Sequence, residues 1–498
     1  MKQKGALIPQ DKIMLYMIVL GLGMLAYGFH IFNFTLTIDA EFRDNYYQTI
    51  SLGRWGHAFL RVLFLPEPFI PYFTHLISIA ALCAAAVAIS DILRHKGIVS
   101  YLFCALFITF PQMAYQFEFI NQADTLSLGY LFSAMCVLFY FRARQQELLT
   151  RLTWLVLACA CFVMAIAIYQ TLIFVPPTIL LAYLLVDSYE TEKGFRETCA
   201  EVIRFAAFTI VSAFIYITMS SWVQHLHGIE AESSIVVGID FQTGIWPYIQ
   251  GSLFKMWQGL MGTSYFGFIT FSVASLCTLV TLLKCFFCSF KTALIRAFLV
   301  ISILVFPYLA VMATTHELPP RVFVAAGLSF SVLVINELRF FKSALVSVVL
   351  VAVLCLVNVS LINKLFYSDV IVREADVLMA NRIRTLMAVK HPDFEESNTP
   401  VYFHGGISKV SKHKLPDSDV FGSSFFSWDG GNNLRIMAFF DYYGIASFRL
   451  AQEEEVLDVL DEINSMPTWP EYDAITMVND VMVVKLGADV GWLPFDVE

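Results

Sequence analysis

The sequence predicts a polytopic all-α membrane protein that ends in a small soluble α/β domain. Of its 498 residues, 58% are hydrophobic and only 15% are charged, whereas soluble domains are about half apolar and about a quarter charged. Long apolar runs recur from residue 12 to about residue 362, and the chain is polar and charged from there to its end. We therefore expect a membrane domain over residues 1–362 and a soluble domain over residues 363–498.

The apolar runs predict the individual spans, because about 17 to 25 apolar residues suffice for a helix to cross a bilayer. About eleven runs meet this condition, and they begin near Ile13, Phe69, Ile98, Thr125, Leu152, Thr171, Phe205, Phe266, Leu294, Val322 and Ala344. The first run follows Lys2 and Lys4, as in a signal peptide, but it continues to Phe34 without a small-residue cleavage site. We expect this helix to be retained.

Lysine and arginine in short loops predict the orientation, because they gather on the cytoplasmic side. With the N-terminus inside, one set of loops holds most of the basic residues, including Arg94, Lys96, Arg142, Arg144, Lys284, Arg296 and Arg339. The other short loops hold only Arg43, Arg54, Arg61, Lys255 and Arg321. An odd number of spans then places the soluble domain outside the cytoplasm. In a bacterium, this arrangement would correspond to a multi-pass protein of the inner membrane with a periplasmic C-terminal domain.

The tail of about 135 residues is long enough for one compact domain. Its pattern predicts a polar helix over residues 369–389, a strand over Pro400–His404 and a helix over residues 452–464. The Asn479-Asp480 pair separates two short β-rich runs, which predicts a hairpin. All 10 cysteines lie at or before Cys355, so no disulfide framework is expected in this tail.

The charge distribution argues against a nucleic-acid partner, and the cysteine spacing argues against a metal site. The net charge of −9 is concentrated in the tail, which argues against a nucleic-acid partner. Cys285 and Cys288 form a CxxC pair at the end of a span, but no second pair accompanies it, so we expect no metal site there.

The first outward loop carries the strongest functional signal. Three acidic residues, Asp39, Glu41 and Asp44, follow directly after a membrane helix. Basic and aromatic residues come next, namely Arg43, Arg54, Trp55, His57 and Arg61. A carboxylate at the water interface can act as a general base while an arginine orients it or binds phosphate. The alternative is that these charges only fix the topology and that Trp55 belongs to an interfacial aromatic belt.

Other outward loops carry polar residues at the same depth, and they favour the functional interpretation. The second contains Glu118, Gln122 and Asp124, the third Tyr169 and Gln170, and a later one His316, Glu317 and Arg321. Ionisable groups near hydrocarbon are costly unless they line water or a partner, so the pattern predicts a cavity open to the outer face. Because nucleotide sugars and ATP are absent there, a donor would have to arrive attached to a lipid.

Several segments resemble one known family. The IDAEFRD run after the first span, the LGRWGHAFL run, the Tyr169-Gln170 pair and the tail segment FGSSFFSWDGGNNLR are similar to bacterial and phage O-antigen glucosyltransferases of the Gtr serotype-converting type. The resemblance extends from the first span into the tail. It implies a membrane glycosyltransferase of the GT-C class that transfers glucose from undecaprenyl-phosphate glucose to an O-antigen repeat of lipopolysaccharide in the periplasm.

The resemblance also implies a catalytic acidic residue in the first outward loop, which here is Asp39 or Glu41. It implies a functional link to a flippase and to a polyprenyl-phosphate glucosyl synthase. Acceptor sugar and linkage vary within the family and do not carry over.

The chemistry of the candidate residues agrees with such a reaction. A carboxylate can take the proton of the attacking sugar hydroxyl, and cationic side chains can stabilise the leaving lipid phosphate. The candidates for the phosphate are Arg43, Arg54, Arg61 and Arg321. Candidate substrate contacts are Asp44, Trp55, Glu118, Gln122, Asp124, Tyr169, Gln170, His316 and Glu317. A monophosphate leaving group requires no metal, so we expect neither a metal nor another cofactor besides the lipid-linked donor.

Two other functions remain open at this point. A transporter or flippase of lipid-linked sugars also needs polar residues within a membrane bundle, but it commonly has related halves and charges near the bilayer midplane. The sequence shows no convincing internal repeat, and its acidic residues gather at span ends. An O-antigen polymerase is the other alternative, although this tail domain is not expected in one.

Overall fold

The computed structural model describes residues 9–42, 45–66, 68–191, 194–231, 244–313, 318–489 and 491–493. The chain divides into two compact units. The membrane unit consists of Met1–Phe32 and Asp44–Asn363. The C-terminal unit consists of Lys364–Glu498 together with the short segment Asn33–Arg43, which we call the acidic segment.

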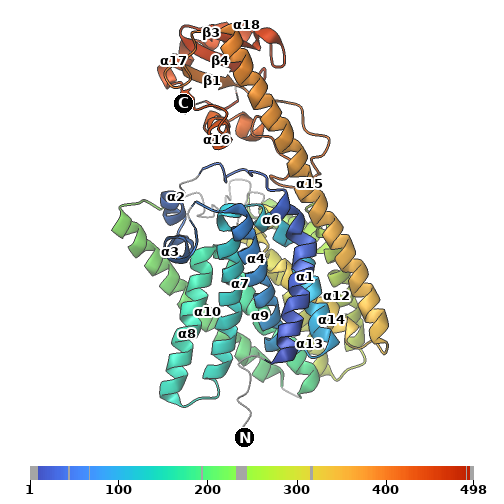
Figure 1. The fold of residues 1–498 in the computed structure, drawn as a ribbon. Helices are drawn as coiled ribbons and strands as arrows, with labels where there is room; N and C mark the ends of the chain where they lie inside the picture. The colour runs from blue at the N-terminus through green and yellow to red at the C-terminus, as the bar shows by residue number, and fades with distance from the viewer. Residues whose placement is uncertain are drawn as a thin grey trace. The chain divides into compact units, whose positions relative to one another are not determined.

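The membrane unit is helical (Figure 1). Its main elements are α1 (Gln10–Phe32), α2 (Tyr46–Ser51), α3 (Trp55–Phe64), α4 (Pro71–Ile92), α5 (Ile98–Thr109), α6 (Gln112–Phe117), α7 (Ile120–Ala143), α8 (Leu148–Ile168), η1 (Gln170–Phe174), α9 (Val175–Glu190), α10 (Phe195–His227), α11 (Ile245–Met261), η3 (Phe268–Thr270), α12 (Phe271–Cys285), α13 (Phe290–Val305), η4 (Phe306–Ala313), η5 (Pro320–Val322), α14 (Ala326–Leu338) and the first half of α15 (Ala344–Lys390).

Among the described residues, nine helices are long and apolar enough to cross a membrane, and α5 and α14 are shorter apolar helices. Together they account for every apolar run that the sequence predicts as a span. The prediction of a polytopic all-α membrane protein is therefore confirmed. At a rise of about 1.5 Å per residue, the 12 residues of α5 and the 13 residues of α14 are too few to cross a bilayer of about 30 Å unaided.

The break after α5 shapes the second outward loop. Pro111 follows Phe110 and cannot continue the hydrogen bonding of α5, so the chain makes the separate short helix α6 before α7 begins. The polar side chains of this stretch are buried, because Gln112 and Gln116 are 0% exposed and Glu118 is 1% exposed. Interrupted helices in membrane proteins are tolerated where protein or water satisfies the freed backbone groups.

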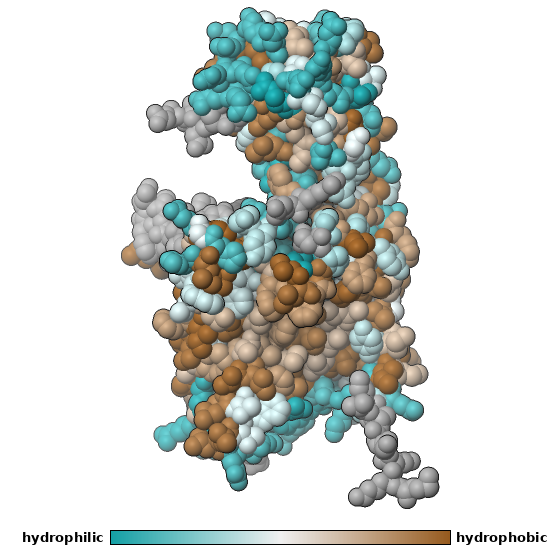
Figure 2. All heavy atoms as spheres, turned by 60° about the vertical axis from the view of Figure 1, so that its left-hand side comes forward, coloured by the Kyte–Doolittle hydropathy of each residue, from teal (hydrophilic) through white to brown (hydrophobic). Residues whose placement is uncertain are grey.

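The outer surface of the bundle is apolar. On the face shown in Figure 2, brown side chains cover the helices of the membrane unit. Helix α10 illustrates the pattern, because it exposes Ile210, Phe214 and Trp222. Only 11% of its most apolar 18-residue stretch is buried inside the protein. Exposed apolar side chains on a long helix are expected where lipid is the solvent.

The C-terminal unit contains a four-stranded sheet with the order β2-β1-β4-β3. Its strands are β1 (Pro400–His404), β2 (Arg449–Leu450), β3 (Ile475–Val478) and β4 (Val481–Lys485). Strand β1 runs parallel to β2 and β4, whereas β3 and β4 form an antiparallel hairpin. The helices are the second half of α15, α16 (Asn433–Tyr442), α17 (Glu453–Leu457) and α18 (Leu460–Ser465), with short turns η6 (Trp428–Gly430) and η7 (Tyr472–Ala474).

Local sequence explains these elements. Asn479 and Asp480 have positive φ angles of 44° and 64°, which the tight turn of a two-residue hairpin requires and which Asn and Asp tolerate. Gln452 and Glu455 form a capping box at the start of α17. The sheet packs its β1 and β4 side chains, including Tyr402 and Val483, against α17 and α18. The predicted hairpin and the α/β character of the tail are confirmed, and the single helix predicted over 452–464 is two short helices.

The acidic segment folds into the C-terminal unit, although it follows α1 directly in the chain. Leu36, Ile38 and Ala40 are buried, at 0%, 2% and 0% exposure, and Tyr443 after α16 is hydrogen-bonded to the Leu36 backbone. Burial of these side chains and the backbone bond hold the segment in place. The two carboxylates that the sequence selects are thereby fixed within the C-terminal unit.

Candidate active site

The acidic segment delivers both candidate carboxylates to one arginine, Arg435 of α16. The Arg435 Nη2 atom lies 2.9 Å from Asp39 Oδ1, and its Nη1 atom donates to Glu41 Oε1. Its Nε atom lies 2.8 Å from Asp429 Oδ2. The five donors of a guanidinium suit this arrangement, because they can serve several carboxylates at once. We call Asp39, Glu41, Asp429 and Arg435 the carboxylate centre.

Two asparagines fix Arg435 in place. The Asn432 side chain caps α16 and accepts hydrogen bonds from the Leu434 and Arg435 amides. Asn433 accepts a hydrogen bond of 2.7 Å from the Phe403 amide and donates one of 2.8 Å to the Phe403 carbonyl. These bonds tie the first turn of α16 to strand β1, so the position of the guanidinium is set by the sheet.

The two candidate carboxylates differ in exposure. The side chain of Asp39 is 45% exposed, whereas that of Glu41 is 0% exposed. Asp39 has a φ angle of +74°, a left-handed conformation that Asp and Asn adopt more readily than most residues. This turn presents the Asp39 carboxylate outward and keeps Glu41 inside.

Burial dominates the electrostatics of Glu41. It raises the pKa of Glu41 from 4.5 to about 7, although the positive charge of Arg435 opposes this shift. The Glu41 Oε2 atom is buried and has no hydrogen-bond partner among the described residues. Near neutral pH, Glu41 can thus exchange a proton, and its protonation weakens its attraction for Arg435.

This raised pKa predicts a dependence of stability on pH. Between pH 4.5 and about 7 the folded protein retains the Glu41 proton, whereas the unfolded chain releases it. The free energy of unfolding should therefore fall as the pH rises through this window, by at most about 3 kcal/mol from this group. The Glu41→Gln variant should lose this component, while Glu454→Gln, at an exposed position, should keep it. Thermal unfolding of wild type and both variants in detergent, from pH 5 to pH 8, measures this component. Identical pH profiles for wild type and Glu41→Gln would contradict the assignment of the raised pKa to Glu41.

A cavity of about 540 Å³ lies in the C-terminal unit beside the start of the acidic segment. Its wall combines aromatic, apolar and polar side chains, namely Asn33, Phe34, Thr35, Val370, Arg373, Glu374, Val377, Leu378 and Tyr443. The Thr35 Oγ1 and Arg373 Nε atoms are buried without a hydrogen-bond partner among the described residues. Aromatic faces mixed with amide, guanidinium and carboxylate groups can stack on and hydrogen-bond a polar ring.

In the membrane unit, Arg54 is the centre of a second polar group. The half-buried Arg54 side chain donates to Gln170 Oε1 and to Gln122 Oε1, both at 3.4 Å. Its guanidinium lies over the Tyr169 ring, 4.8 Å from the centroid. Side chains from α7 and from the break between α8 and η1 thus orient one cation. The structure brings together Arg54, Gln122, Tyr169 and Gln170, which the sequence selects from three separate segments.

Arg61 occupies a different environment. Its Nη2 atom lies 2.7 Å from Asp124 Oδ1 and 2.6 Å from the Asn121 carbonyl oxygen. Both side chains of the pair are almost completely buried, at 4% and 1% exposure. On the same helix, His57 Nδ1 lies 2.8 Å from Thr125 Oγ1, so α3 is docked on α7 through two polar contacts. A buried ion pair of this kind fixes geometry, and this docking sets the position of Arg54 at the start of α3.

The glycines of the LGRWGHAFL run explain how α3 fits. Gly53 has a φ angle of +74°, and Gly56 packs so closely on α8 that an added Cβ would lie 2.8 Å from the Ala167 Cβ. Between them, Trp55 donates from Nε1 to Ser220 Oγ of α10 at 3.1 Å. Trp55 thus forms a hydrogen bond that helps to dock α3 on α10, and its predicted role in substrate binding stays a prediction.

The remaining predicted residues divide into two groups. Arg321 in η5 is half-buried and lies over the Phe119 ring, 4.4 Å from its centroid. Its carbonyl oxygen accepts hydrogen bonds from Gln112 and Gln116 of α6, so η5 is held beside the α6–α7 junction, where Glu118 is buried. The other predicted residues lie outside the described residues, and they are Arg43, Asp44, His316 and Glu317.

Arg435 and Asp429 are site residues that the sequence alone does not identify. Both belong to the FGSSFFSWDGGNNLR segment that carries part of the family resemblance, and the asparagine pair before Arg435 is a helix-capping signal. Nothing in the spacing links position 435 to positions 39 and 41, because only the fold brings them together.

Comparison with known proteins agrees with the resemblance. The family model described as glucosyl transferase GtrII matches residues 28–335, more than half of the chain. The match includes the acidic segment and the residues around Arg54, and it ends before the segment that contains Arg435. No curated protein and no solved structure matches the chain. The chain belongs to the GtrII glucosyl transferase family and is a membrane-embedded glycosyltransferase.

Proposed function

We propose that the protein transfers glucose from undecaprenyl-phosphate glucose to an O-antigen repeat unit of lipopolysaccharide, on the periplasmic side of the bacterial inner membrane. The observation that carries this proposal is the carboxylate centre, in which one arginine holds the two first-loop carboxylates. The family match supports the transferred sugar. The orientation predicted from basic loops supports the side of the membrane.

Asp39 is the general base in this proposal. The acceptor hydroxyl oxygen attacks the anomeric carbon of the donor glucose, its proton passes to the Asp39 carboxylate, and the bond from the anomeric carbon to the lipid phosphate oxygen breaks. Exposure decides between the two carboxylates, because a base must come within hydrogen-bond reach of the proton it removes. Glu41 acts through Arg435 and is a positioning residue.

Arg54 is the main donor contact in this proposal, since the leaving lipid phosphate needs positive charge beside it. It is half-buried and oriented by two amides and a tyrosine ring. Arg321 is the second candidate, whereas the guanidinium of Arg61 is directed at Asp124. The lipid-linked sugar is the only small molecule that this reaction requires, and neither a metal nor another cofactor takes part.

The acceptor sugar chain would occupy the 540 Å³ cavity of the C-terminal unit. Its wall includes Asn33, Phe34 and Thr35 of the acidic segment. Asp39 belongs to the same segment of the polypeptide, four residues after Thr35, so the cavity and the proposed base are close in sequence. A functional link to a flippase and to a polyprenyl-phosphate glucosyl synthase follows from this donor, because the donor must be made and must reach the outer leaflet.

The roles of Arg54 and Arg61 can be separated by substitution. Arg54→Gln should raise the KM for the lipid-linked donor by about 10- to 100-fold, the value of a lost charged hydrogen bond, with little change in the thermal midpoint. Arg61→Gln should instead lower the midpoint, because it leaves Asp124 buried without its cation at a cost of about 3–5 kcal/mol. Donor titrations and thermal unfolding of both purified variants measure this, and a reversed pattern would contradict the assignment.

Reconstitution tests the proposal as a whole. The purified full chain in vesicles receives polyprenyl-phosphate [¹⁴C]glucose and lipid-linked O-antigen, and label in the O-antigen fraction is measured. We expect label to appear there. If no acceptor becomes labelled but labelled lipid crosses the vesicle membrane, the protein is a transporter of lipid-linked sugars and the proposal is wrong. If acceptor chains lengthen without labelled glucose, the protein is a polymerase.

A further inference from the structure

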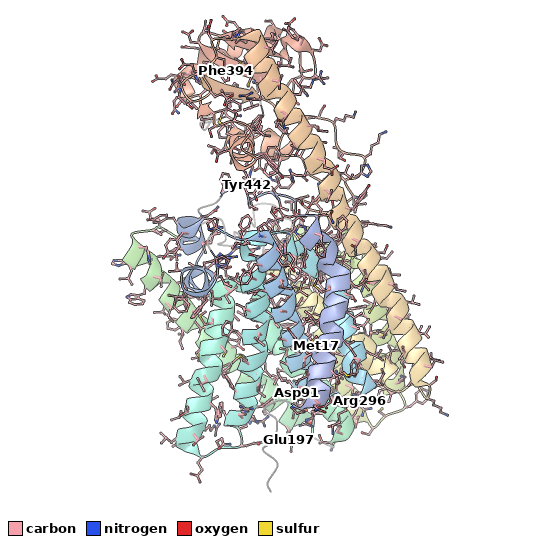
Figure 3. All side chains as sticks on the ribbon, in the orientation of Figure 1. Met17, Asp91, Glu197, Arg296, Phe394 and Tyr442 are labelled. Carbon is pink, nitrogen blue, oxygen red and sulfur yellow. The ribbon has the colours of Figure 1, made fainter. Side chains whose placement is uncertain are left out.

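A second polar cavity, of about 410 Å³, lies in the membrane unit and takes no part in the proposed reaction. It lies where α4 and α14 end and where α9 ends, and its wall consists of Arg94, His95, Lys96, Val99, Val186, Glu190 and Arg339. Figure 3 labels Asp91 at the end of α4 and Arg296 at this same end of the bundle. The basic loops that predict the cytoplasmic side include Arg94, Lys96 and Arg339.

Positive charge exceeds negative charge around this cavity. The Arg94 Nη1 atom lies 3.1 Å from Glu190 Oε2 and 3.3 Å from Asp187 Oδ1. Arg94 thus forms ion pairs with both nearby carboxylates. Neither Lys96 nor Arg339 forms an ion pair within the part of the chain that the structure describes. The cavity wall therefore has two cationic groups that form no ion pair within the described residues, although Arg339 also interacts with the Tyr189 hydroxyl and, at longer range, with Glu190.

A third cation adds to this excess. The guanidinium groups of Arg339 and Arg296 both lie close to the Tyr189 ring, 4.0 Å and 3.8 Å from its centroid. The carboxylate nearest to Arg339 in the sequence is that of Glu337, and it is paired with Lys284. The positive charges of Arg296 and Arg339 repel each other, and a bound anion would relieve that repulsion.

Unsatisfied donors give the same indication. The Nε and Nη2 atoms of Arg339 are buried without a hydrogen-bond acceptor among the described residues, and His95 Nδ1 is buried without a partner. Buried polar groups are normally hydrogen-bonded, and an exception in a native protein indicates a partner such as a bound ion or water. Two of these three unsatisfied atoms belong to one guanidinium, so we infer that the missing partner is an acceptor that carries negative charge.

We propose that this cavity binds a phosphate-bearing anion at the cytoplasmic ends of the membrane helices. Guanidinium groups bind phosphate through paired, charge-assisted hydrogen bonds, and a lysine adds a point charge. The phosphate belongs either to the headgroup of an anionic phospholipid or to free inorganic phosphate. Basic recesses between membrane helices on this side are placed to receive lipid headgroups.

The test compares three probes on the purified full chain in neutral detergent. Phosphatidylglycerol, phosphatidylcholine and inorganic phosphate are titrated separately, and binding is followed by native mass spectrometry and by the thermal midpoint. Binding of phosphatidylglycerol with no competition from phosphate identifies a lipid headgroup, and competition by phosphate identifies the free anion. Equal binding of phosphatidylglycerol and phosphatidylcholine, or no binding of either anion, overturns the proposal.

Substitutions assign any binding to the cavity. Lys96 is exposed, so Lys96→Gln should fold normally and weaken binding by about tenfold, the low end of the range for one charged hydrogen bond. Arg339→Gln should weaken it at least as much. Lys342→Gln, an exposed lysine on the following loop that does not line the cavity, serves as the matched control and should leave binding unchanged. If Lys342→Gln weakens binding as much as Lys96→Gln, the anion responds to general surface charge and the proposal fails.

Discussion

Replacing Asp39 with asparagine should reduce glucosyl transfer by about a thousandfold, within the range that removal of a general base produces. Asparagine has nearly the same shape and accepts the left-handed backbone of this position, whose φ angle is +74°. It cannot take the proton of the acceptor hydroxyl. The fold should therefore persist while the turnover rate falls, and the KM for the donor should change little. Initial rates with saturating donor and acceptor measure the effect.

A matched control for this variant is Asp417→Asn. Asp417 is also left-handed, with a φ angle of 51°, and it is exposed in the same C-terminal unit. It should transfer glucose at the wild-type rate. If Asp39→Asn retains more than about a tenth of wild-type turnover while Glu41→Gln loses it, the base is Glu41, and exposure is the wrong criterion for choosing between them.

Replacing Arg435 with glutamine should lower turnover by about a hundredfold. Without the guanidinium, Asp39, Glu41 and Asp429 face one another with no shared cation, and like charges at short range repel. Asp39 then loses its defined orientation, and a misplaced catalytic group costs about this much. Arg435→Lys should recover little activity, because an ammonium group cannot reproduce the planar fork that contacts three carboxylates.

Because Arg435 is a positioning residue, its test needs more than a rate. The KM for the donor should stay near the wild-type value, and the pH–rate profile should shift, since Arg435 holds down the Glu41 pKa against burial. Arg384→Gln removes a surface arginine that is paired with Glu396 in the same unit and should change neither quantity. A selective loss of donor affinity in Arg435→Gln would place this arginine on the donor phosphate instead.

The sequence predicts the membrane helices well because hydropathy alone constrains them. Each apolar run forms a helix, and the Asn479-Asp480 turn forms as its residue types require. The α5–α6 break is less visible, because the apolar pattern continues through Phe110 and only Pro111 indicates it. In the tail, the helix predicted over 452–464 is interrupted between α17 and α18, which the acidic pattern does not indicate.

The candidate site is only partly predictable for a different reason. Asp39, Glu41 and Arg54 can be selected because charged residues beside a membrane helix are costly and therefore informative. Their division into a buried and an exposed carboxylate depends on the turn at Asp39, and the partner Arg435 is almost 400 positions away in the chain. Such long-range pairing leaves no trace in one sequence. The ion pair between Arg61 and Asp124 likewise depends on how α3 docks on α7.

A double-mutant cycle on Asp39 and Arg435 tests the central claim most directly, which is that the carboxylate centre acts as one catalytic unit. Turnover is measured for wild type, Asp39→Asn, Arg435→Gln and the double variant with saturating donor and acceptor. Residues that act together are strongly non-additive. We predict that the double variant is no slower than Asp39→Asn alone. If the two losses multiply, to about 10⁵-fold by the estimates above, Arg435 acts independently of Asp39 and the carboxylate centre is not a unit.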